Sequence, residues 1–363
     1  MKDRVPLYPG RVKLTPVAGQ TNIYDLVRAD QPKQEGTPLN KASLLTDETA
    51  AAIGLSGDPT VNNALYALMH NIQPAVLNVY TIPSSTVKAT LGSTTVTAIS
   101  NVQGKATLGL YQFGTWTVTV TTSSTTVTKS LVVDKISTYT LAVVQSLQET
   151  SWATISALAD AGVANEVWSV GDTKNITVNG TSYVVQIIGF NHDTKTDGNK
   201  AGITFQMVDC LATKYKYNNT TLTSYTWTKS TMRTSTLPSI FKQLNTDLKS
   251  VIKTVKKATG SHSYSSSSGS PTTTTETTEQ LFLLASVEVT GSTRSTVTGE
   301  GTRYEWYSAG NSRVKKINGT AETWWLRSPT KSQNSVQVIT TEGGESSGDP
   351  SYSQWGVAFA FCV

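Results

Sequence analysis

The chain has 363 residues and a formal net charge of +5, and only 15% of its residues are charged. The charge is spread along the chain instead of forming a basic stripe with interleaved aromatics, which disfavours a nucleic-acid-binding protein. No apolar stretch approaches the roughly 18 residues of a membrane helix, and the N-terminus lacks the apolar core of a signal peptide. Ser, Thr and Gly replace the missing charge and apolar mass, a composition that favours sheets with polar faces.

Residues 1–74 predict an arm followed by short helices. Residues 1–40 carry five prolines, each of which disfavours helix at the residue before it: Pro6, Pro9, Pro16, Pro32 and Pro38. Two short helical pieces follow within 40–70, and Asn40 is the expected cap of the first. Such a region has too little core to stand alone, so we expect it to attach to a partner or to sister chains.

Residues 75–145 predict a small, Ig-like antiparallel β-sandwich that acts as a spacer. Apolar residues alternate with threonines, as in the run of Trp116, Val118 and Val120. Turn signals such as Gly92-Ser93 separate several such runs within about 70 residues. We expect Trp116 to lie in the core.

Residues 146–363 predict one larger α+β unit. The apolar spacing favours helices at Trp152–Ala164, near Pro238 and at Leu244–Val255, the last with a solvated face formed by Lys249, Lys253, Lys256 and Lys257. The Ser/Thr-rich insert 261–278 is expected to be a mobile loop. Strands are expected at Val167–Ser169, Asn175–Val178, Tyr183–Phe190, Ile203–Leu211, Gln280–Val289, Trp324–Leu326, Val336–Ile339 and Gly356–Cys362.

Residues suited to catalysis or metal binding are scarce. Of the three histidines only His192 lies beside carboxylates, and its loop fails the calcium-loop spacing, so a hydrogen-bonded turn is expected. Cys210 and Cys362 lack metal-site spacing and are expected to be buried free thiols. No catalytic residue, cofactor or metal site is predicted. A carboxylate pair for glycoside cleavage stays open among Glu300, Glu305, Glu322, Glu342, Glu345 and Asp349.

The C-terminal segment is the most distinctive part of the sequence. Trp324-Trp325-Leu326-Arg327-Ser328-Pro329 places two indoles beside a guanidinium. On a strand, one indole would face the core and the other would stack on Arg327. About 25 small polar residues follow before an apolar strand, and Tyr352 and Trp355 add flat faces suited to sugar rings or protein anchors. The alternative is that this polar segment is a plain exposed loop without a binding role.

Two groups of motifs resemble known families. Lys2–Val12 and Glu35–Lys41 resemble the N-terminal attachment region of tail-fibre-like proteins from phages and prophages of gut Firmicutes. The second group resembles a phage-associated domain family of unknown function, whose members resemble the variable proteins of diversity-generating retroelements. It consists of Trp168–Asp172, Gly189–Asp193, Leu281–Val289, the WWLRSP segment and Gly356–Cys362.

This second resemblance implies a C-type-lectin-like fold with a diversified, ligand-contacting segment between fixed strands. The implied ligand-binding residues are Thr330, Lys331, Gln333, Asn334, Ser335, Gln337, Thr340, Glu342, Ser346, Asp349, Ser351, Tyr352, Ser353, Gln354 and Trp355. The implied framework residues are Trp324, Trp325, Arg327, Gly356, Phe359 and Phe361.

The sequence thus predicts a mainly β protein with an α+β, C-type-lectin-like C-terminal domain. The expected function is that of a non-enzymatic phage adhesin, a tail-fibre or receptor-binding protein located on the virion. We expect a homotrimer that attaches to other tail proteins through residues 1–74 and binds a host cell-surface protein or glycan. A structural collar or head-decoration protein is one alternative, and a depolymerase of surface glycans is another.

Overall fold

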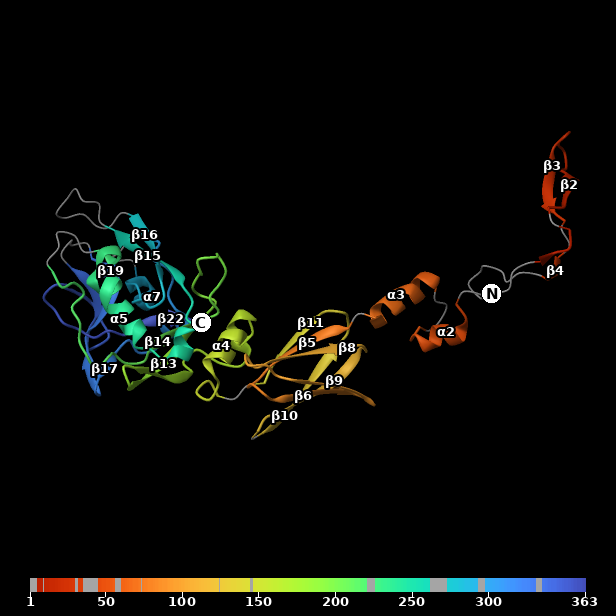
Figure 1. The fold of residues 1–363 in the computed structure, drawn as a ribbon. Helices are drawn as coiled ribbons and strands as arrows, with labels where there is room; N and C mark the ends of the chain where they lie inside the picture. The colour runs from red at the N-terminus through yellow and green to blue at the C-terminus, as the bar shows by residue number, and fades with distance from the viewer. Residues whose placement is uncertain are drawn as a thin grey trace. The chain divides into compact units, whose positions relative to one another are not determined.

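The structure is a computed structural model, and it describes residues 5–8, 10–29, 32–34, 45–55, 60–72, 74–123, 125–143, 146–220, 226–261, 273–292, 298–330 and 335–363. The chain is mainly β, with several small antiparallel sheets and a few short helices (Figure 1). Within these ranges, no helix has both the length and the apolar character needed to cross a bilayer.

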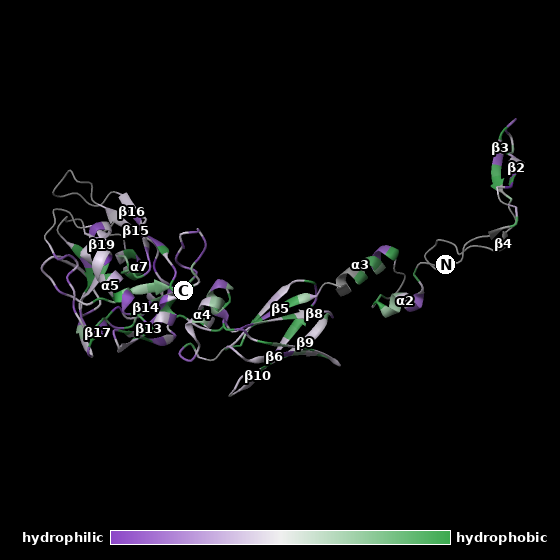
Figure 2. Cartoon of the chain, in the orientation of Figure 1, coloured by the Kyte–Doolittle hydropathy of each residue, from purple (hydrophilic) through white to green (hydrophobic). Residues whose placement is uncertain are grey.

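The N-terminal region contains strand pairs where an extended arm was expected. Its bounds are β1 (Val5–Pro6), β2 (Val12–Pro16), β3 (Tyr24–Arg28) and β4 (Pro32–Gln34). Strand β1 pairs with β4, and β2 forms an antiparallel hairpin with β3 in which Leu14 lies opposite Leu26. Because side chains alternate between faces, Val12, Leu14, Tyr24 and Leu26 share one face. Leu14 is 58% exposed and Leu26 69% exposed. Figure 2 shows hydrophobic (green) and hydrophilic (purple) residues side by side on this hairpin.

Two short helices follow, as predicted: α2 (Asp47–Ala52) and α3 (Val61–Ile72). Thr46 is the cap of α2, because its side chain accepts a hydrogen bond from the Thr49 N–H at 3.2 Å. The predicted cap, Asn40, lies outside the described residues. Among the described residues of this region, Leu45, Ala50 and Ala64 form the buried apolar cluster, which is a small core.

Seven strands follow in the predicted spacer region and form two sheets. Their bounds are β5 (Ala75–Tyr80), β6 (Thr86–Leu91), β7 (Thr94–Ile99), β8 (Lys105–Leu110), β9 (Gly114–Thr121), β10 (Thr126–Val133) and β11 (Thr138–Ala142). One sheet has the order β10-β9-β6-β7 and the other β11-β5-β8, in which β11 runs parallel to β5. Trp116, Val118 and Val120 are buried while Thr115 and Thr117 are exposed. The alternation therefore set the faces of β9 as predicted.

The described residues of the region 146–363 form four sheets and several short helices. The bounds are α4 (Trp152–Asp160), η1 (Ala164–Glu166), β12 (Thr173–Val178), β13 (Thr181–Phe190), β14 (Ile203–Met207), η2 (Trp227–Lys229), η3 (Met232–Thr236), α5 (Leu237–Lys242), α6 (Thr246–Lys249), β15 (Val255–Ser261), β16 (Thr273–Glu279), α7 (Ser286–Thr290), α8 (Glu305–Ser308), β17 (Lys315–Ile317), β18 (Thr320–Glu322), β19 (Trp324–Pro329), β20 (Val336–Ile339), β21 (Glu345–Gly348) and β22 (Ala360–Cys362).

The central sheet of this region has the order β12-β13-β14-β22. Strand β14 is buried along its whole length, and so is β22, the strand it pairs with. The other sheets are β19-β20-β21, β15-β16 and β17-β18. Parts of the chain that are far apart in sequence therefore meet in one core, and this core positions the C-terminal segment.

Several predictions for this region were wrong. The expected helix Leu244–Val255 is only the four-residue α6, after which β15 begins. The end of the expected loop insert is β16, which pairs with β15, while residues 262–272 lie outside the described ranges. The expected strand Gln280–Val289 contains helix α7, and no strand forms at Val167–Ser169.

Candidate functional site

The candidate site is the C-terminal segment together with the buried framework beneath it. All six residues of β19 are buried, and so are the predicted framework residues Gly356, Phe359 and Phe361. Both indoles of this strand, Trp324 and Trp325, are fully buried. The expectation that one of them stacks on Arg327 was wrong, because the guanidinium is engaged by a carboxylate instead.

Arg327 of β19 is fully buried, and its guanidinium contacts several elements of the site. Its two terminal nitrogens donate to both carboxylate oxygens of Glu288 on α7, at 2.6 and 2.9 Å. Its remaining donors reach the carbonyl oxygens of Leu283 and Glu300 and the hydroxyl of Thr259. All five guanidinium hydrogens thus have acceptors, as a buried arginine requires.

Lys257 of β15 connects this ion pair to a second carboxylate. Its ammonium donates to Glu288 at 2.8 Å, to Asp193 at 2.6 Å and to the Tyr304 hydroxyl at 3.0 Å. Asp193 also accepts from the Thr204 hydroxyl at 2.6 Å. We call the four charged residues Asp193, Lys257, Glu288 and Arg327 the buried charge cluster. Its two cations and two anions balance, and it joins the loop after β13 to β15, α7 and β19.

Lys257 corrects the prediction of a solvated lysine face at Lys249–Lys257. Its side chain is buried, since β15 is a strand whose buried face carries Val255, Lys257 and Thr259. Lys253 and Lys256 do form partly exposed ion pairs, with Asp160 and Glu276. Sequence reasoning missed Lys257 because a helical period was assumed. The alternation of Val255, Lys257 and Thr259 was the available signal.

Burial and charge act in opposite directions on the carboxyl groups here. For Asp193, burial opposes ionisation, but Lys257 and His192 outweigh it and hold the pKa well below its ordinary value. For Glu288, burial is likewise outweighed by Arg327 and Lys257, and the pKa is lowered. Glu300 differs, because burial prevails over its hydrogen bonds from the Gly260 N–H and the Ser328 hydroxyl and raises its pKa.

Aromatic contacts continue the framework towards the C-terminal segment. Trp325 packs on Trp355 with ring centroids 4.6 Å apart, and its indole N–H donates to the Tyr215 carbonyl oxygen at 2.8 Å. Tyr215 and Trp355 also exchange both backbone hydrogen bonds. Glycine is required beside these groups, since a Cβ at Gly356 would lie 2.5 Å from the Cys210 sulfur. Cys210 and Cys362 are both buried and free, as predicted.

The predicted ligand-binding residues that the structure describes are buried, partly exposed or exposed. Thr330, Gln337 and Ser351 are buried, so their side chains do not form a binding surface, and we remove them from it. Lys331, Gln333 and Asn334 lie outside the described residues. Ser335, Thr340, Ser353 and Trp355 are partly exposed, and Glu342, Ser346, Asp349, Tyr352 and Gln354 are exposed.

Tyr352 is the most exposed large apolar side chain in the described part of the chain, at 82%. Its turn is fixed by Asp349, whose Oδ1 accepts from the Ser351 N–H, the Ser351 hydroxyl and the Tyr352 N–H at 2.8, 2.8 and 3.2 Å. Just before it, the Pro350 carbonyl oxygen accepts from the Asn218 N–H at 2.9 Å. An exposed aromatic side chain therefore stands on a turn with a fixed backbone.

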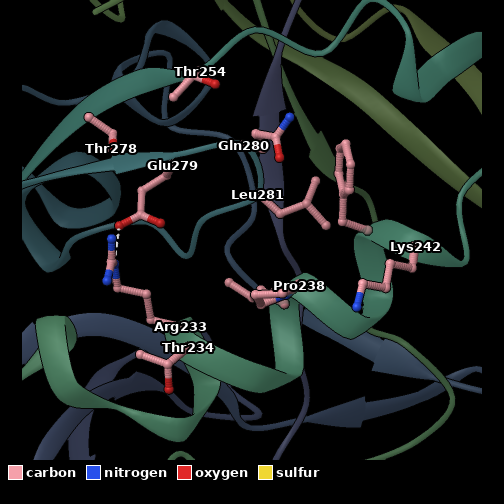
Figure 3. A pocket seen from close by; sticks show the side chains of 11 residues that line it. Arg233, Thr234, Pro238, Lys242, Thr254, Thr278, Glu279, Gln280 and Leu281 are labelled. Carbon is pink, nitrogen blue, oxygen red and sulfur yellow. Dashed lines mark hydrogen bonds and ion pairs between the residues drawn. The ribbon is translucent and has the colours of Figure 1, made fainter.

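Cavities in the region 146–363 include two that are lined by charged residues. One, of about 390 Å³, is lined by members of the buried charge cluster together with His192, Glu300 and Thr302. The other, of about 640 Å³, is bounded by η3, α5 and the end of β16. Figure 3 shows Arg233 and Glu279 on one side of this larger cavity, with Pro238 and Leu281 beside them.

Five of the six candidate carboxylates have hydrogen-bond or ion-pair partners of their own. Glu300 and Glu345 accept hydrogen bonds from Ser328 and Ser286, and Glu322 pairs with Lys214 at 2.6 Å. Glu342 accepts from Thr341, Asp349 holds its turn, and Glu305 is exposed at the start of α8. Over the ranges that the structure describes, no three His, Cys, Asp or Glu side chains are arranged to hold a metal ion.

Comparisons with known proteins give a match to a family model and distant similarity to solved structures. Residues 201–363 match the model of a domain of unknown function, DUF6273. No curated protein matches the chain. Among solved structures, a fimbrial protein from Bacteroides ovatus is similar at 8% sequence identity and a TM-score of 0.24, covering 80% of this chain and 71% of the other.

Changing Arg327 to Met should strongly destabilise the C-terminal region, because it leaves Glu288 buried without its bidentate partner. We expect a loss of about 3–5 kcal/mol in the free energy of unfolding. Urea unfolding followed by tryptophan fluorescence measures it, since Trp116 alone among the eight tryptophans lies outside residues 146–363. Arg327→Met combined with Glu288→Leu should recover part of the loss, and a double variant as unstable as the sum of both singles would contradict the ion-pair account.

The buried charge cluster also predicts acid sensitivity. The folded-state pKa values of Asp193 and Glu288 lie below their ordinary values of 3.8 and 4.5. Below about pH 4.5 the unfolded chain therefore takes up protons first, and stability falls as the pH drops towards the folded-state pKa values. The urea midpoint should decrease from pH 5 to pH 3, and less steeply in Asp193→Asn. A midpoint that stays constant over this range would contradict the prediction.

Proposed function

We propose that this chain is a non-enzymatic phage adhesin that recognises a ligand on the host cell surface through its C-terminal segment. The observation that supports this function best is the exposed Tyr352, presented on a turn fixed by Asp349 above a fully buried framework. Aromatic side chains held in this way are typical anchors of protein and glycan recognition, because they contribute large contact area at low entropic cost.

The exposed polar residues around Tyr352 complete the proposed surface. Ser346 lies on β21, Asp349 and Gln354 lie on either side of Tyr352, and Glu342 lies in the turn between β20 and β21. Substitutions at these exposed positions would leave the framework contacts of Trp325 and Arg327 in place. That separation suits the proposed role of a diversified segment on a C-type-lectin-like fold.

A structural collar or decoration protein would have no need for Tyr352 on its surface, whereas a depolymerase needs two converging carboxylates. Among the six candidates, Glu300, Glu322 and Glu345 are engaged with partners of their own. These contacts support binding without catalysis as the proposed role.

Changing Tyr352 to Ala should reduce binding of fluorescently labelled full-length protein to the strains of a gut Firmicutes panel that the wild type binds. We expect a loss of roughly tenfold or more in apparent affinity, the effect of removing an interface anchor. Tyr111→Ala, an exposed tyrosine outside the C-terminal region, is the matched control and should bind normally. Equal binding by the Tyr352 and Tyr111 variants, or no wild-type binding to any strain, would argue for a structural role.

We further propose that residues 1–74 assemble the chain into a homotrimer and attach it to other tail proteins. The hairpin β2–β3 supports this proposal, because an isolated two-stranded hairpin is only marginally stable in water. This hairpin also exposes Val12, Leu14, Tyr24 and Leu26 on one face. Covering that face with sister chains would bury the apolar area that the hairpin lacks.

The double variant Leu14→Lys, Leu26→Lys should dissociate the assembly, because it places like charges on the apolar face of each chain. The native mass from light scattering should fall from three subunits to one. The control is Thr15→Lys with Val27→Lys, which adds the same charge to the opposite face of the hairpin and should leave the mass unchanged. A wild-type protein that is already monomeric would contradict the proposed trimer.

A further inference from the structure

The larger cavity of the C-terminal region has walls of two kinds. Glu279 and Arg233 form a charged wall, and an apolar wall is formed by Leu237, Pro238, Phe241 and Leu281. Figure 3 shows the carboxylate of Glu279 and the guanidinium of Arg233 meeting at one side, with Leu281 and Pro238 next to them and Lys242 at the other side. Threonine hydroxyls and the Gln280 amide surround this space.

Glu279 is the polar centre of the cavity, although its side chain is only 7% exposed. Its Oε1 accepts from the Trp227 indole N–H at 2.8 Å and from the Arg233 Nε–H at 2.5 Å. Its other oxygen, Oε2, receives no hydrogen bond from any residue that the structure describes. Glu279 lines the cavity, so Oε2 is placed to accept a hydrogen bond from a ligand that enters it.

Arg233 supplies the complementary donor. It uses its Nε–H on Glu279 and one Nη1–H on the Thr228 carbonyl oxygen at 3.4 Å. Within the described ranges its Nη2 group has no acceptor. The wall therefore offers an acceptor from Glu279 beside a donor from Arg233, with both groups held in place by their mutual ion pair.

This pattern selects the chemistry of the ligand. A carboxylate only accepts and a guanidinium only donates, whereas a hydroxyl group does both. Two neighbouring hydroxyls can therefore satisfy the pair together, while the C–H face of the same ring packs on the apolar wall. An anionic group placed against this pair fits less well, because Arg233 is already neutralised by Glu279 and Oε2 would repel a second negative charge, while the third charged side chain, Lys242, lies at the other side of the cavity.

We propose that this cavity is a saccharide-binding site that takes one neutral sugar ring through two adjacent hydroxyl groups. Glu279 accepts from one hydroxyl, Arg233 donates to the other, and Leu281, Pro238 and Phe241 contact the ring. The site shares no residue with the Tyr352 surface, so it goes beyond the proposed function and stands or falls separately from it.

The test is binding of methyl glycosides of glucose, galactose, mannose and rhamnose to the full-length protein, measured by saturation-transfer NMR and titration. At least one glycoside should bind, and Glu279→Gln should weaken it by roughly tenfold or more, the effect of losing a charged hydrogen-bond acceptor. Thr278→Trp places an indole at the cavity without changing Glu279 and should also abolish binding.

Three controls make the outcome specific. Thr320→Trp, at an exposed strand threonine that does not line this cavity, should bind like the wild type, and so should Tyr352→Ala. Galacturonate should bind more weakly than methyl galactoside. The proposal is overturned if no neutral glycoside binds, if both cavity variants bind normally, or if galacturonate binds more tightly.

Discussion

The ion pair between Arg327 and Glu288 is the constraint on which the C-terminal region depends. Both side chains are removed from water, and an unpaired charge there would cost several kcal/mol, so the partners must meet in nearly one geometry. Lys257 and Asp193 extend the same requirement to two further segments. A shift of β19 by one residue would turn Arg327 to the opposite face of the strand and separate it from Glu288.

This constraint explains how one side of the C-terminal segment can be rigid while the other is free to carry polar residues. The buried side chains of Arg327, Trp324 and Trp325 fix the position of β19. Trp355 packs on Trp325, whose indole N–H donates to the Tyr215 carbonyl oxygen. The residues between β21 and Trp355 have one structural requirement, which is to form the turn that Asp349 stabilises. Whatever ligand contacts Tyr352, the cost of ordering that turn is met within the protein.

The sequence predicted those parts of the fold in which local pattern and tertiary environment agree. Alternation located the strands around Trp116 and along β13, and the all-apolar ending predicted the buried strand β22. It misplaced β15, because the spacing of Leu244, Leu248 and Val251 suits a helix while the pairing with β16 is decided by a distant segment. Lys257 and Asp193 could not be paired from sequence alone, since the positive and negative partners lie 64 residues apart. Tyr352 was identified correctly as exposed, but the burial of Gln337 and Ser351 follows from tertiary contacts that no local pattern reports.

The contact between Asp193 and Cys362 has a consequence for how this region folds. These residues are 169 positions apart, and β14 pairs with β22 across nearly the same distance, as Thr204 lies opposite Cys362. Contacts of such long sequence separation incur a large loop-closure entropy before any pairing energy is gained, so they form late and slowly. In a partly folded chain in which β22 has not yet paired with β14, the edge of β14 and the apolar face of the central sheet would be exposed to solvent. The yield of folded protein should therefore depend on the rate of this strand closure as well as on the final stability of the region.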